Sequence, residues 1–258
     1  MNVIDTHLHL TDLRIWDQRL EILDKMKEQS ITSFLNAGFC KEEWLRQLKL
    51  KTINPNFKMA WGLHPYWVDA QKDSEERLQL EFDYLKENID QIDAIGETGL
   101  DLRTQFSESE KLQEEYFNKH LDLHFYSKKA LVLHFVRNLG RGIKILKSKN
   151  KKFTGIIHSF SGSWEEAQAL IELGFFISIS SGVCNPKAKR IRRVAKEISL
   201  QHLLIETDSP DQAPPDWSEK YNMPWAVFEV AKCISEINGK SPEKIIQGSN
   251  ENFQSLFA

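Results

Sequence analysis

The chain has 258 residues, of which 41% are hydrophobic and 28% are charged, and its formal net charge at pH 7 is −3. This is the composition of an ordinary soluble globular protein, and the small negative charge excludes a whole-protein attraction to nucleic acid or to an anionic membrane. A single domain of about 250 residues is usual for an α/β barrel, so we expect one domain over residues 1–258.

Short apolar runs alternate with longer amphipathic segments along the chain. The apolar runs predict eight strands, at residues 3–5, 33–36, 59–63, 94–97, 131–134, 155–158, 175–179 and 203–207. Helical patterns follow at residues 13–28, 41–51, 74–88, 108–126, 139–147, 164–173, 186–197, 225–237 and 242–247. This alternation implies parallel strands with right-handed crossovers, and eight such units predict a closed (β/α)8 barrel of the TIM type.

The cysteines and the N-terminus carry information about the compartment. Cys40, Cys184 and Cys233 are far apart, odd in number and free of C-x-x-C spacing, so we expect no disulfide framework. The N-terminus lacks the basic and apolar regions of a signal peptide, and no apolar run approaches the ~20 residues needed to cross a bilayer. These features predict a cytoplasmic protein with no membrane partner, and we expect a monomer.

Side chains that commonly bind metals stand at the ends of five predicted strands: His7, His9, Glu97, His134, His158 and Asp208. His7 and His9 are two apart on one strand, so both side chains point to the same face. Because the carboxyl ends of barrel strands meet at one face, we expect all of them to form one site. Imidazole and carboxylate ligands together suit Zn, Mn, Fe or Ni better than an all-oxygen cage would.

Other histidines and acids have a more ordinary interpretation. Asp5 and Glu206 precede His7 and Asp208 by two residues, where a carboxylate can hold a ligand histidine in one tautomer. His120 and His124 are four apart on a predicted helix, and we interpret them as part of a solvated helix face.

The order and spacing of the motifs resemble the TatD family of metal-dependent deoxyribonucleases, within the amidohydrolase-like barrel superfamily. The resemblance covers the whole chain, up to Asn252 and Leu256-Phe257 near its end. The motifs are His7-x-His9, Gly62-Leu63-His64-Pro65, Gly96-Glu97-Thr98-Gly99-Leu100-Asp101, His134-Phe135-Val136-Arg137, His158-Ser159-Phe160-Ser161-Gly162 and Glu206-Thr207-Asp208-Ser209-Pro210.

The resemblance implies two divalent metal ions (Mg, Mn or Zn) that hydrolyse a phosphodiester. One ion would bind His7, His9 and Asp208, the other would bind His134 and His158, and Glu97 would bridge them. Asp208 and Glu97 would act in catalysis, with Asp208 taking a proton from metal-bound water. The resemblance also implies that His64 and Arg137 contact the substrate phosphate.

The sequence departs from the family pattern around the site. Ser159 stands where many members have Cys, Asp211-Gln212 follow Pro210 where Tyr is common, and Tyr221 stands where Arg often precedes Asn-x-Pro. The first hypothesis for the substrate is therefore DNA, with single-stranded DNA preferred. The second is a small amide, ester or phosphoester substrate on the same metal site, and the third is a non-catalytic scaffold.

Two further features bear on that choice. A basic run, Lys187 to Arg193, begins the helix after the seventh strand on the catalytic face, where attraction of phosphate would explain it. The loop of residues 209–224 follows the last strand, and we expect it to cover the mouth of the barrel. Aromatic residues near this mouth are candidates for stacking on unpaired bases: Tyr66, Trp67, Trp164 and Trp217.

Overall fold

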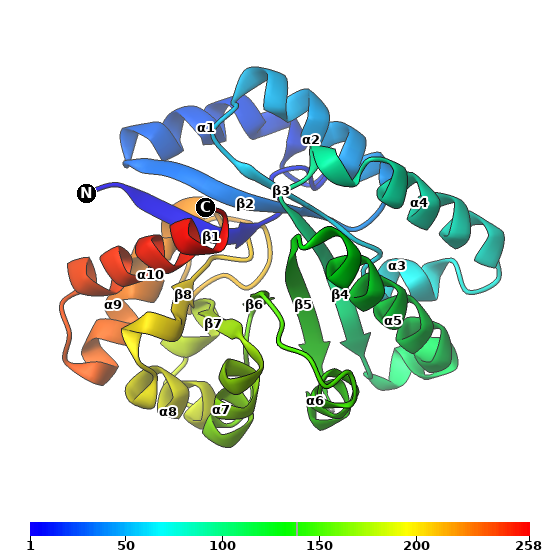
Figure 1. Cartoon of the computed structure of the whole chain (residues 1–258). Helices are drawn as coiled ribbons and strands as arrows, with labels where there is room; N and C mark the ends of the chain where they lie inside the picture. The colour runs from blue at the N-terminus through cyan, green and yellow to red at the C-terminus, as the bar shows by residue number, and fades with distance from the viewer. Residues whose placement is uncertain (138) are drawn as a thin grey trace.

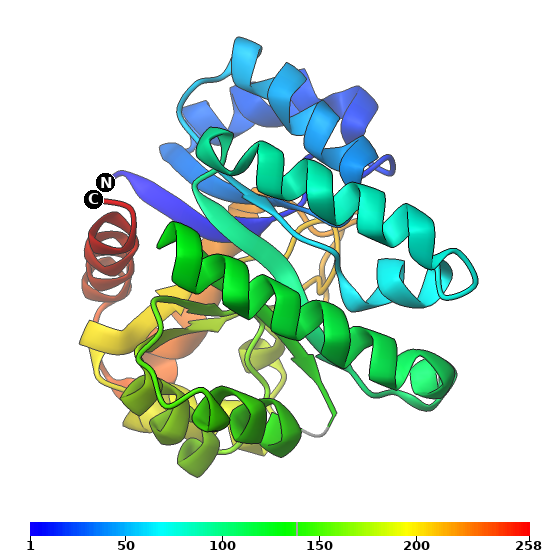
Figure 2. The ribbon, with the colours of Figure 1, turned by 45° about the vertical axis from the view of Figure 1, so that its right-hand side comes forward.

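In the computed structural model, which describes residues 1–137 and 139–258, eight parallel strands form one sheet in chain order, and helices wrap around its outside (Figures 1 and 2). The (β/α)8 barrel predicted from the sequence is confirmed. The strands are β1 (Val3–Leu8), β2 (Ile31–Gly38), β3 (Lys58–Trp61), β4 (Ala94–Asp101), β5 (Ala130–Val136), β6 (Gly155–Ile157), β7 (Phe175–Ile179) and β8 (Leu203–Ile205).

The first and last strands meet and complete the circle. The hydroxyl of Thr6 donates to the carbonyl of Ile205 at 2.9 Å, and the backbone N–H of Asp208 donates to the carbonyl of His7 at 3.0 Å. The barrel thus brings side chains from the two ends of the sequence next to one another.

Each strand is followed by at least one helix on the outside of the barrel. The helices are α1 (Arg19–Glu28), α2 (Lys41–Ile53), α3 (Pro65–Ala70), α4 (Glu75–Glu87), α5 (Glu110–Ser127), α6 (Leu139–Ser148), α7 (Trp164–Leu173), α8 (Lys189–Glu197), α9 (Val227–Asn238) and α10 (Pro242–Leu256). The short α3 is absent from the sequence-based elements, and α10 is longer than the predicted 242–247. On α10, Asn250 accepts a hydrogen bond from the N–H of Ile4 at 3.0 Å and so holds the last helix against β1.

Local sequence signals explain where individual helices begin and end. The hydroxyl of Ser163 accepts from the N–H of Glu166, while the Glu166 carboxylate accepts from the N–H of Ser163, which is a capping box at the start of α7. Gly174 ends the same helix with φ 104°, a left-handed conformation that favours glycine, and β7 begins at the next residue. The α7–β7 unit is therefore specified by its own residues.

The inside of the barrel is filled by apolar side chains. A buried cluster is drawn mainly from the strands and includes Ile4, Leu35, Ala60, Val132 and Leu204. A larger buried cluster combines the other strand positions with the inner faces of the helices. Because the interior is packed, the site must lie at an end of the barrel rather than within it.

One expectation about the cysteines is wrong. The structure joins Cys184 and Cys233 in a disulfide with Cα atoms 5.4 Å apart, while Cys40 is free and buried. Cys184 ends the turn that follows β7, and Cys233 lies on α9, which packs against that turn. The pairing depends on this long-range packing, which residue spacing does not reveal. Among the helices of residues 1–137 and 139–258, none has both the length and the apolar character needed to cross a bilayer.

Candidate metal centre

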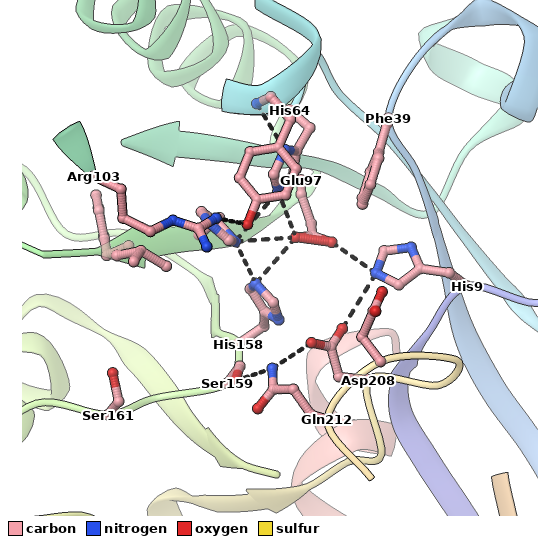
Figure 3. A pocket seen from close by; sticks show the side chains of 15 residues that line it. His9, Phe39, His64, Glu97, Arg103, His158, Ser159, Ser161, Asp208 and Gln212 are labelled. Atoms are coloured by element: carbon pink, nitrogen blue, oxygen red, sulfur yellow. Dashed lines mark hydrogen bonds and ion pairs between the residues drawn. The ribbon is translucent and has the colours of Figure 1, made fainter. Parts of the chain in front are cut away.

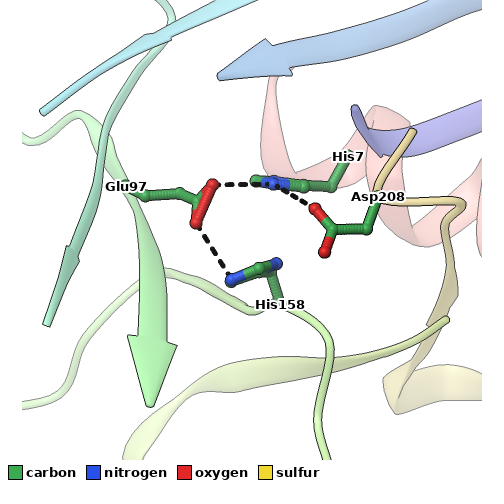
Figure 4. Close-up of side chains that lie close together, drawn as sticks. All are labelled: His7, Glu97, His158 and Asp208. Atoms are coloured by element: carbon green, nitrogen blue, oxygen red, sulfur yellow. Dashed lines mark hydrogen bonds and ion pairs between the residues drawn. The ribbon is translucent and has the colours of Figure 1, made fainter. Parts of the chain in front are cut away.

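The metal-type side chains named from the sequence converge at the carboxyl end of the barrel. His7 lies in β1, Glu97 in β4 and His134 in β5, whereas His158 and Asp208 follow the ends of β6 and β8. Each of them, together with His9, is at most 7% exposed. Figure 4 shows four of them facing one another across a small space.

Glu97 lies between two groups of imidazole nitrogens. Its Oε1 lies 3.0 Å from Nε2 of His7 and 3.0 Å from Nε2 of His9. Its Oε2 lies 3.0 Å from Nε2 of His158 and 3.5 Å from Nδ1 of His134. The carboxylate is turned toward both sides of the site in Figures 3 and 4. One carboxylate therefore serves two sets of donors, one with each oxygen.

Asp208 adds a second carboxylate on one side only. Its Oδ1 lies 3.5 Å from Nε2 of His7 and 3.3 Å from Nε2 of His9. We refer to His7, His9, Asp208 and Oε1 of Glu97 as the first donor group. The second donor group consists of His134, His158 and Oε2 of Glu97. The family resemblance would assign one ion to each of these groups.

The donor atoms fit a divalent cation. Nε2 of His7 and Nε2 of His9 lie 3.2 Å apart, and Nδ1 of His134 lies 2.9 Å from Nε2 of His158. Nitrogens this close cannot both present a proton to one another, but a cation between the lone pairs would satisfy both. Donor atoms of His7, Glu97, His158 and Asp208 all lie within 4.8 Å of one another. Imidazole with carboxylate is a donor set that Zn²⁺ and Mn²⁺ accept.

The charges in the site also favour a cation. Burial raises the pKa of Glu97, but His158, His7 and His9 outweigh it and lower that pKa well below its ordinary value. Burial opposes the charged form of His9 as well, yet the Glu97 and Asp208 carboxylates raise the His9 pKa well above its ordinary value. Two ionised carboxylates in a buried site need compensating positive charge, which either protonated imidazoles or a cation bound between neutral imidazoles can supply.

Groups behind the donors orient the histidine rings. Nδ1 of His9 lies 3.1 Å from the carbonyl of Ala37, which leaves Nε2 for the site. Nε2 of His134 lies 3.4 Å from Oδ2 of Asp101, which leaves Nδ1 for the site. Glu206 lies behind a ring in the same way, because its Oε1 is 3.5 Å from Nδ1 of His158.

Asp5 has a different role from the one interpreted from the sequence. It does not hold a histidine ring. Its Oδ1 accepts from the N–H of Thr207 at 3.0 Å and from the N–H of His7 at 3.3 Å, and its Oδ2 accepts from the hydroxyl of Thr207 at 2.5 Å. Asp5 therefore joins the backbone of β1 to the segment that carries Asp208.

The backbone beside the site is unusually tight. A Cβ added to Gly99 would lie 2.1 Å from the carbonyl oxygen of His134, so only glycine lets β4 approach β5 here. Ser159 and Asp208 follow their strands with φ 43° and φ 58°. Non-glycine residues with positive φ are uncommon and cluster at functional sites.

His64, which was expected to contact the substrate phosphate, lies directly beside the second donor group. It is 1% exposed, its Nδ1 accepts from the N–H of Tyr66 at 3.0 Å, and its Nε2 lies 3.5 Å from Oε2 of Glu97 and 3.3 Å from Nδ1 of His134. Burial, helped by the neighbouring His134, lowers the pKa of His64 to about 3. His64 therefore presents a neutral ring beside the second donor group.

The arginine in the central cavity is Arg103, which sequence reasoning missed. Its Nε donates to Oδ1 of Asp101 at 3.0 Å and its Nη2 donates to Oδ2 at 2.8 Å, and the Tyr66 hydroxyl also accepts from Nη2. Arg137 instead lies exposed on a neighbouring groove. The pair Asp101-x-Arg103, a few residues after the strand predicted at 94–97 and at the end of the observed β4, is the signal that could have found Arg103.

A cavity of about 470 Å³ opens above the donors (Figure 3). Besides the donors it is lined by residues that include Phe39, Tyr66, Arg103, Ser159, Ser161 and Gln212. Gln212 reaches in from the loop after β8, where its amide Nε2 donates to Oδ2 of Asp208 and, at 2.5 Å, to the hydroxyl of Ser159. As expected for this loop, it covers part of the mouth.

The aromatic residues predicted at the mouth separate into two kinds. Tyr66 lines the cavity, whereas the indole N–H of Trp67 donates to Glu81 and that of Trp217 donates to the carbonyl of Tyr221. Trp164 packs against the main apolar core. Phe39, which was not predicted at the mouth, also lines the cavity, and its ring stacks on His64 with centroids 4.2 Å apart.

Comparison with known proteins identifies the family of the chain. Residues 4–258 match the family model described as TatD related DNase. A metal-dependent hydrolase of Buchnera aphidicola strain APS is 31% identical, with 100% of this chain and 99% of the relative covered. The metal-dependent hydrolase YabD of Bacillus subtilis is 30% identical, with 99% and 98% covered.

The fold recurs in solved structures. The TatD homologue YjjV of Escherichia coli superposes with a TM-score of 0.89 at 24% identity, covering 99% of this chain and 97% of that one. A TatD family hydrolase of Entamoeba histolytica gives a TM-score of 0.86 at 20% identity, covering 100% and 98%. The likeness at this level of identity shows the fold, whereas the family model spans nearly every residue of the sequence. The chain belongs to the TatD related DNase family of metal-dependent hydrolases.

Proposed function

We propose that this protein is a phosphodiesterase that cleaves DNA, with single-stranded DNA preferred, by means of two divalent metal ions. The observation that carries the proposal is the Glu97 carboxylate, which directs one oxygen at each of two imidazole groups. An arrangement of this kind suits two cations that share one ligand, as two-metal sites for phosphoryl transfer require.

His7, His9 and Asp208 would hold one ion, His134 and His158 the other, and Glu97 both. When bound, the ions would lower the pKa of a water molecule toward neutrality and neutralise charge on the phosphoryl oxygens. Zn²⁺, Mn²⁺ and Mg²⁺ are the candidates, and the histidine-rich donor set favours the first two.

The chain's own residues would handle the proton and the phosphate. Asp208 faces the first donor group with Oδ1, so Oδ2 is the oxygen that would accept the proton of the attacking water. Gln212 donates to that Oδ2 and would fix its direction. Arg103 would stabilise negative charge on the phosphoryl group, because Asp101 and Tyr66 hold its guanidinium on the cavity wall.

His64 is proposed to contact the phosphate as a neutral donor. Its low pKa leaves it uncharged at neutral pH, and Nε2 faces the second donor group. Its role would therefore be to orient the substrate rather than to add positive charge.

One observation favours a second function, hydrolysis of a small phosphoester, ester or amide. The cavity of about 470 Å³ has the size of a pocket for a small molecule, and Gln212 narrows its mouth. The family description and the basic residues around the cavity favour DNA over this alternative.

The test is hydrolysis of a 5′-labelled single-stranded oligonucleotide by protein reconstituted with Mg²⁺, Mn²⁺ or Zn²⁺. Wild type should give a metal-dependent ladder, and His134→Ala should give none. His120→Gln is the matched control, since it alters a buried histidine outside the site and should cleave like wild type. No cleavage by wild type with metal bound would favour the small-molecule alternative, which a panel of aryl esters and phosphoesters would then test.

A further inference from the structure

Two side grooves open from the central cavity beside Ser161. One, of about 340 Å³, shares His158 and Phe135 with the cavity and is lined further out by Arg137 and Arg190. The other, of about 440 Å³, shares Ser159 and Gln212 with the cavity. Because Ser161 lines all three spaces, they adjoin one another at this residue, and we refer to the three together as the depression.

Basic side chains line the outer part of this depression. Lys187, Lys189 and Arg190 line the second groove, and Arg190 and Arg137 line the first. All four side chains belong to exposed residues. We refer to Arg137, Lys187, Lys189 and Arg190 as the basic rim.

The basic run at the start of α8 divides into two functions. Arg192 donates to the carbonyl of Val183 at 3.0 Å, and Arg193 forms an ion pair with Glu165 at 3.0 Å, so both are used within the fold. In the ion pairs formed among residues 1–137 and 139–258, neither Lys187 nor Lys189 nor Arg190 takes part. The cations without a protein counter-charge are the ones that line the depression.

Protein stability does not explain this arrangement. The first turn of α8 contains no acidic residue, although cations there oppose the helix dipole and repel one another. Glu166 is the acid on the first groove, and its Oε2 already accepts from the N–H of Ser163 at 2.7 Å. A ligand that carries negative charges along its length would offset the repulsion.

Another part of the cavity wall is arranged differently. Asp211 lines the cavity there, and Arg14 donates to it at 2.8 Å while also donating to Asp12 at 2.7 Å. The cation on this side is therefore neutralised by two carboxylates. Among the cations that line the three spaces, Arg103 is paired with Asp101, whereas the basic rim forms no ion pair within residues 1–137 and 139–258.

We propose that the basic rim binds the backbone phosphates of a single-stranded polynucleotide, next to the bond held at the metal centre. This inference rests on the proposed function and makes it more specific. The preferred substrate is an oligonucleotide several residues long, with its uncleaved part over Ser161 and between α6 and α8. Arg190 has the largest role because it lines both grooves.

The direct test measures binding without catalysis. A 5′-fluorescent dT12 is titrated with chelator-treated protein, and anisotropy is recorded over a range of salt concentrations. We expect Arg190→Ala to weaken binding roughly fivefold and to lower the slope of log Kd against log salt by about 0.7, the loss of one phosphate contact on a single strand. Arg190→Glu should weaken binding further. The matched control, Arg193→Ala, removes the same charge from the same helix and should bind like wild type.

A second measurement separates the rim from the metal chemistry. With metal restored, we expect Arg190→Ala to raise KM for dT12 by more than it raises KM for bis(p-nitrophenyl) phosphate, because the small diester does not reach the rim. Equal binding and equal salt slopes for wild type, Arg190→Ala and Arg193→Ala would overturn the role of the rim. Failure of wild type to cleave either diester would instead overturn the proposed function, while the binding titration would still decide the rim.

Discussion

Two sets of buried histidines in this protein have different hydrogen-bonding surroundings. His120 and His124 lie on α5, are 0% and 5% exposed, and are hydrogen-bonded to backbone. Nε2 of His120 accepts from the N–H of Leu63 at 3.1 Å, and Nδ1 of His124 lies 2.7 Å from the carbonyl of Lys129. The interpretation of these residues as part of a solvated helix face is therefore wrong. No metal role was expected for them, and their ring nitrogens contact backbone groups.

The histidines at the strand ends are equally buried, but their nitrogens face one another and the carboxylates of Glu97 and Asp208. Burial therefore does not distinguish a structural histidine from a candidate metal ligand. The distinction lies in whether the inward nitrogen already has a backbone partner. The four predictions that follow alter one set at a time and test this distinction.

The largest effect is expected from removal of the shared carboxylate. Glu97→Gln keeps the size of the side chain but loses the charge that both donor groups face. We expect kcat/KM for an oligonucleotide to fall by roughly a thousandfold or more, about 4 kcal/mol. The metal content of the protein, measured by plasma mass spectrometry, should also fall. Full activity in a folded, metal-loaded variant would contradict the central place of Glu97.

The structural role of the buried histidines on α5 can be tested by changing the pH. Burial lowers the pKa of His120 to about 4, below the value near 6.5 of the unfolded chain. The unfolded chain therefore binds the proton more readily between pH 6.5 and pH 4. The stability contributed by neutral His120 is complete above pH 6.5 and falls by about 3 kcal/mol as the pH drops through that window.

Urea denaturation of wild type and His120→Gln in chelator, at several pH values from 7 to 4, isolates this contribution. The difference in the free energy of unfolding between the two proteins should change with pH across the window. A pH-independent difference would show that the pKa of His120 is the same in the folded and the unfolded chain, and so that burial does not lower it.

Metal binding should stabilise the fold through the strand-end histidines and their carboxylates alone. At a metal concentration one hundred times Kd, the linked gain is about 2.7 kcal/mol, which corresponds to roughly 5–10 °C in Tm for a chain of this size. We expect Zn²⁺ or Mn²⁺ to shift the Tm of wild type and of His120→Gln by similar amounts. Glu97→Gln should lose most of the shift, and an unchanged shift in that variant would place the ion elsewhere.

The smallest effect is expected from substitution of a residue that contacts a candidate ligand from behind. Asp101→Asn weakens the acceptor that faces Nε2 of His134 and one partner of Arg103. Changes at such positions cost 10- to 100-fold in metal affinity or activity, about 2 kcal/mol. Titration with a competing chelator measures the affinity, and an Asp101→Asn protein with wild-type metal affinity would assign Asp101 to Arg103 alone.

Much of the fold and of the donor set could be predicted because the signals are local. Each predicted strand overlaps an observed one, and the strand-end donors follow apolar runs that are evident in the sequence. Parallel strands place their carboxyl ends together, so residues such as His7 and Asp208 could be brought into one site from topology alone. The division into two donor groups came from the family resemblance rather than from spacing.

The rest depends on side-chain direction and on contacts between distant segments. Arg103 follows β4 closely, but only the structure shows that it turns into the cavity while Arg137 turns to the neighbouring groove. Gln212 and Phe39 stand on connections whose paths no periodicity describes. The disulfide between Cys184 and Cys233 depends in the same way on the packing of α9.

The first donor group joins β1 to the segment after β8, so its ligands come from opposite ends of the chain. A ribosome must therefore have produced more than 200 residues before an ion can meet both His7 and Asp208. A chain that is interrupted or cleaved before β8 keeps both strand-end histidines of the second group but cannot complete the first. Binding of an ion by the first donor group would therefore require a closed barrel.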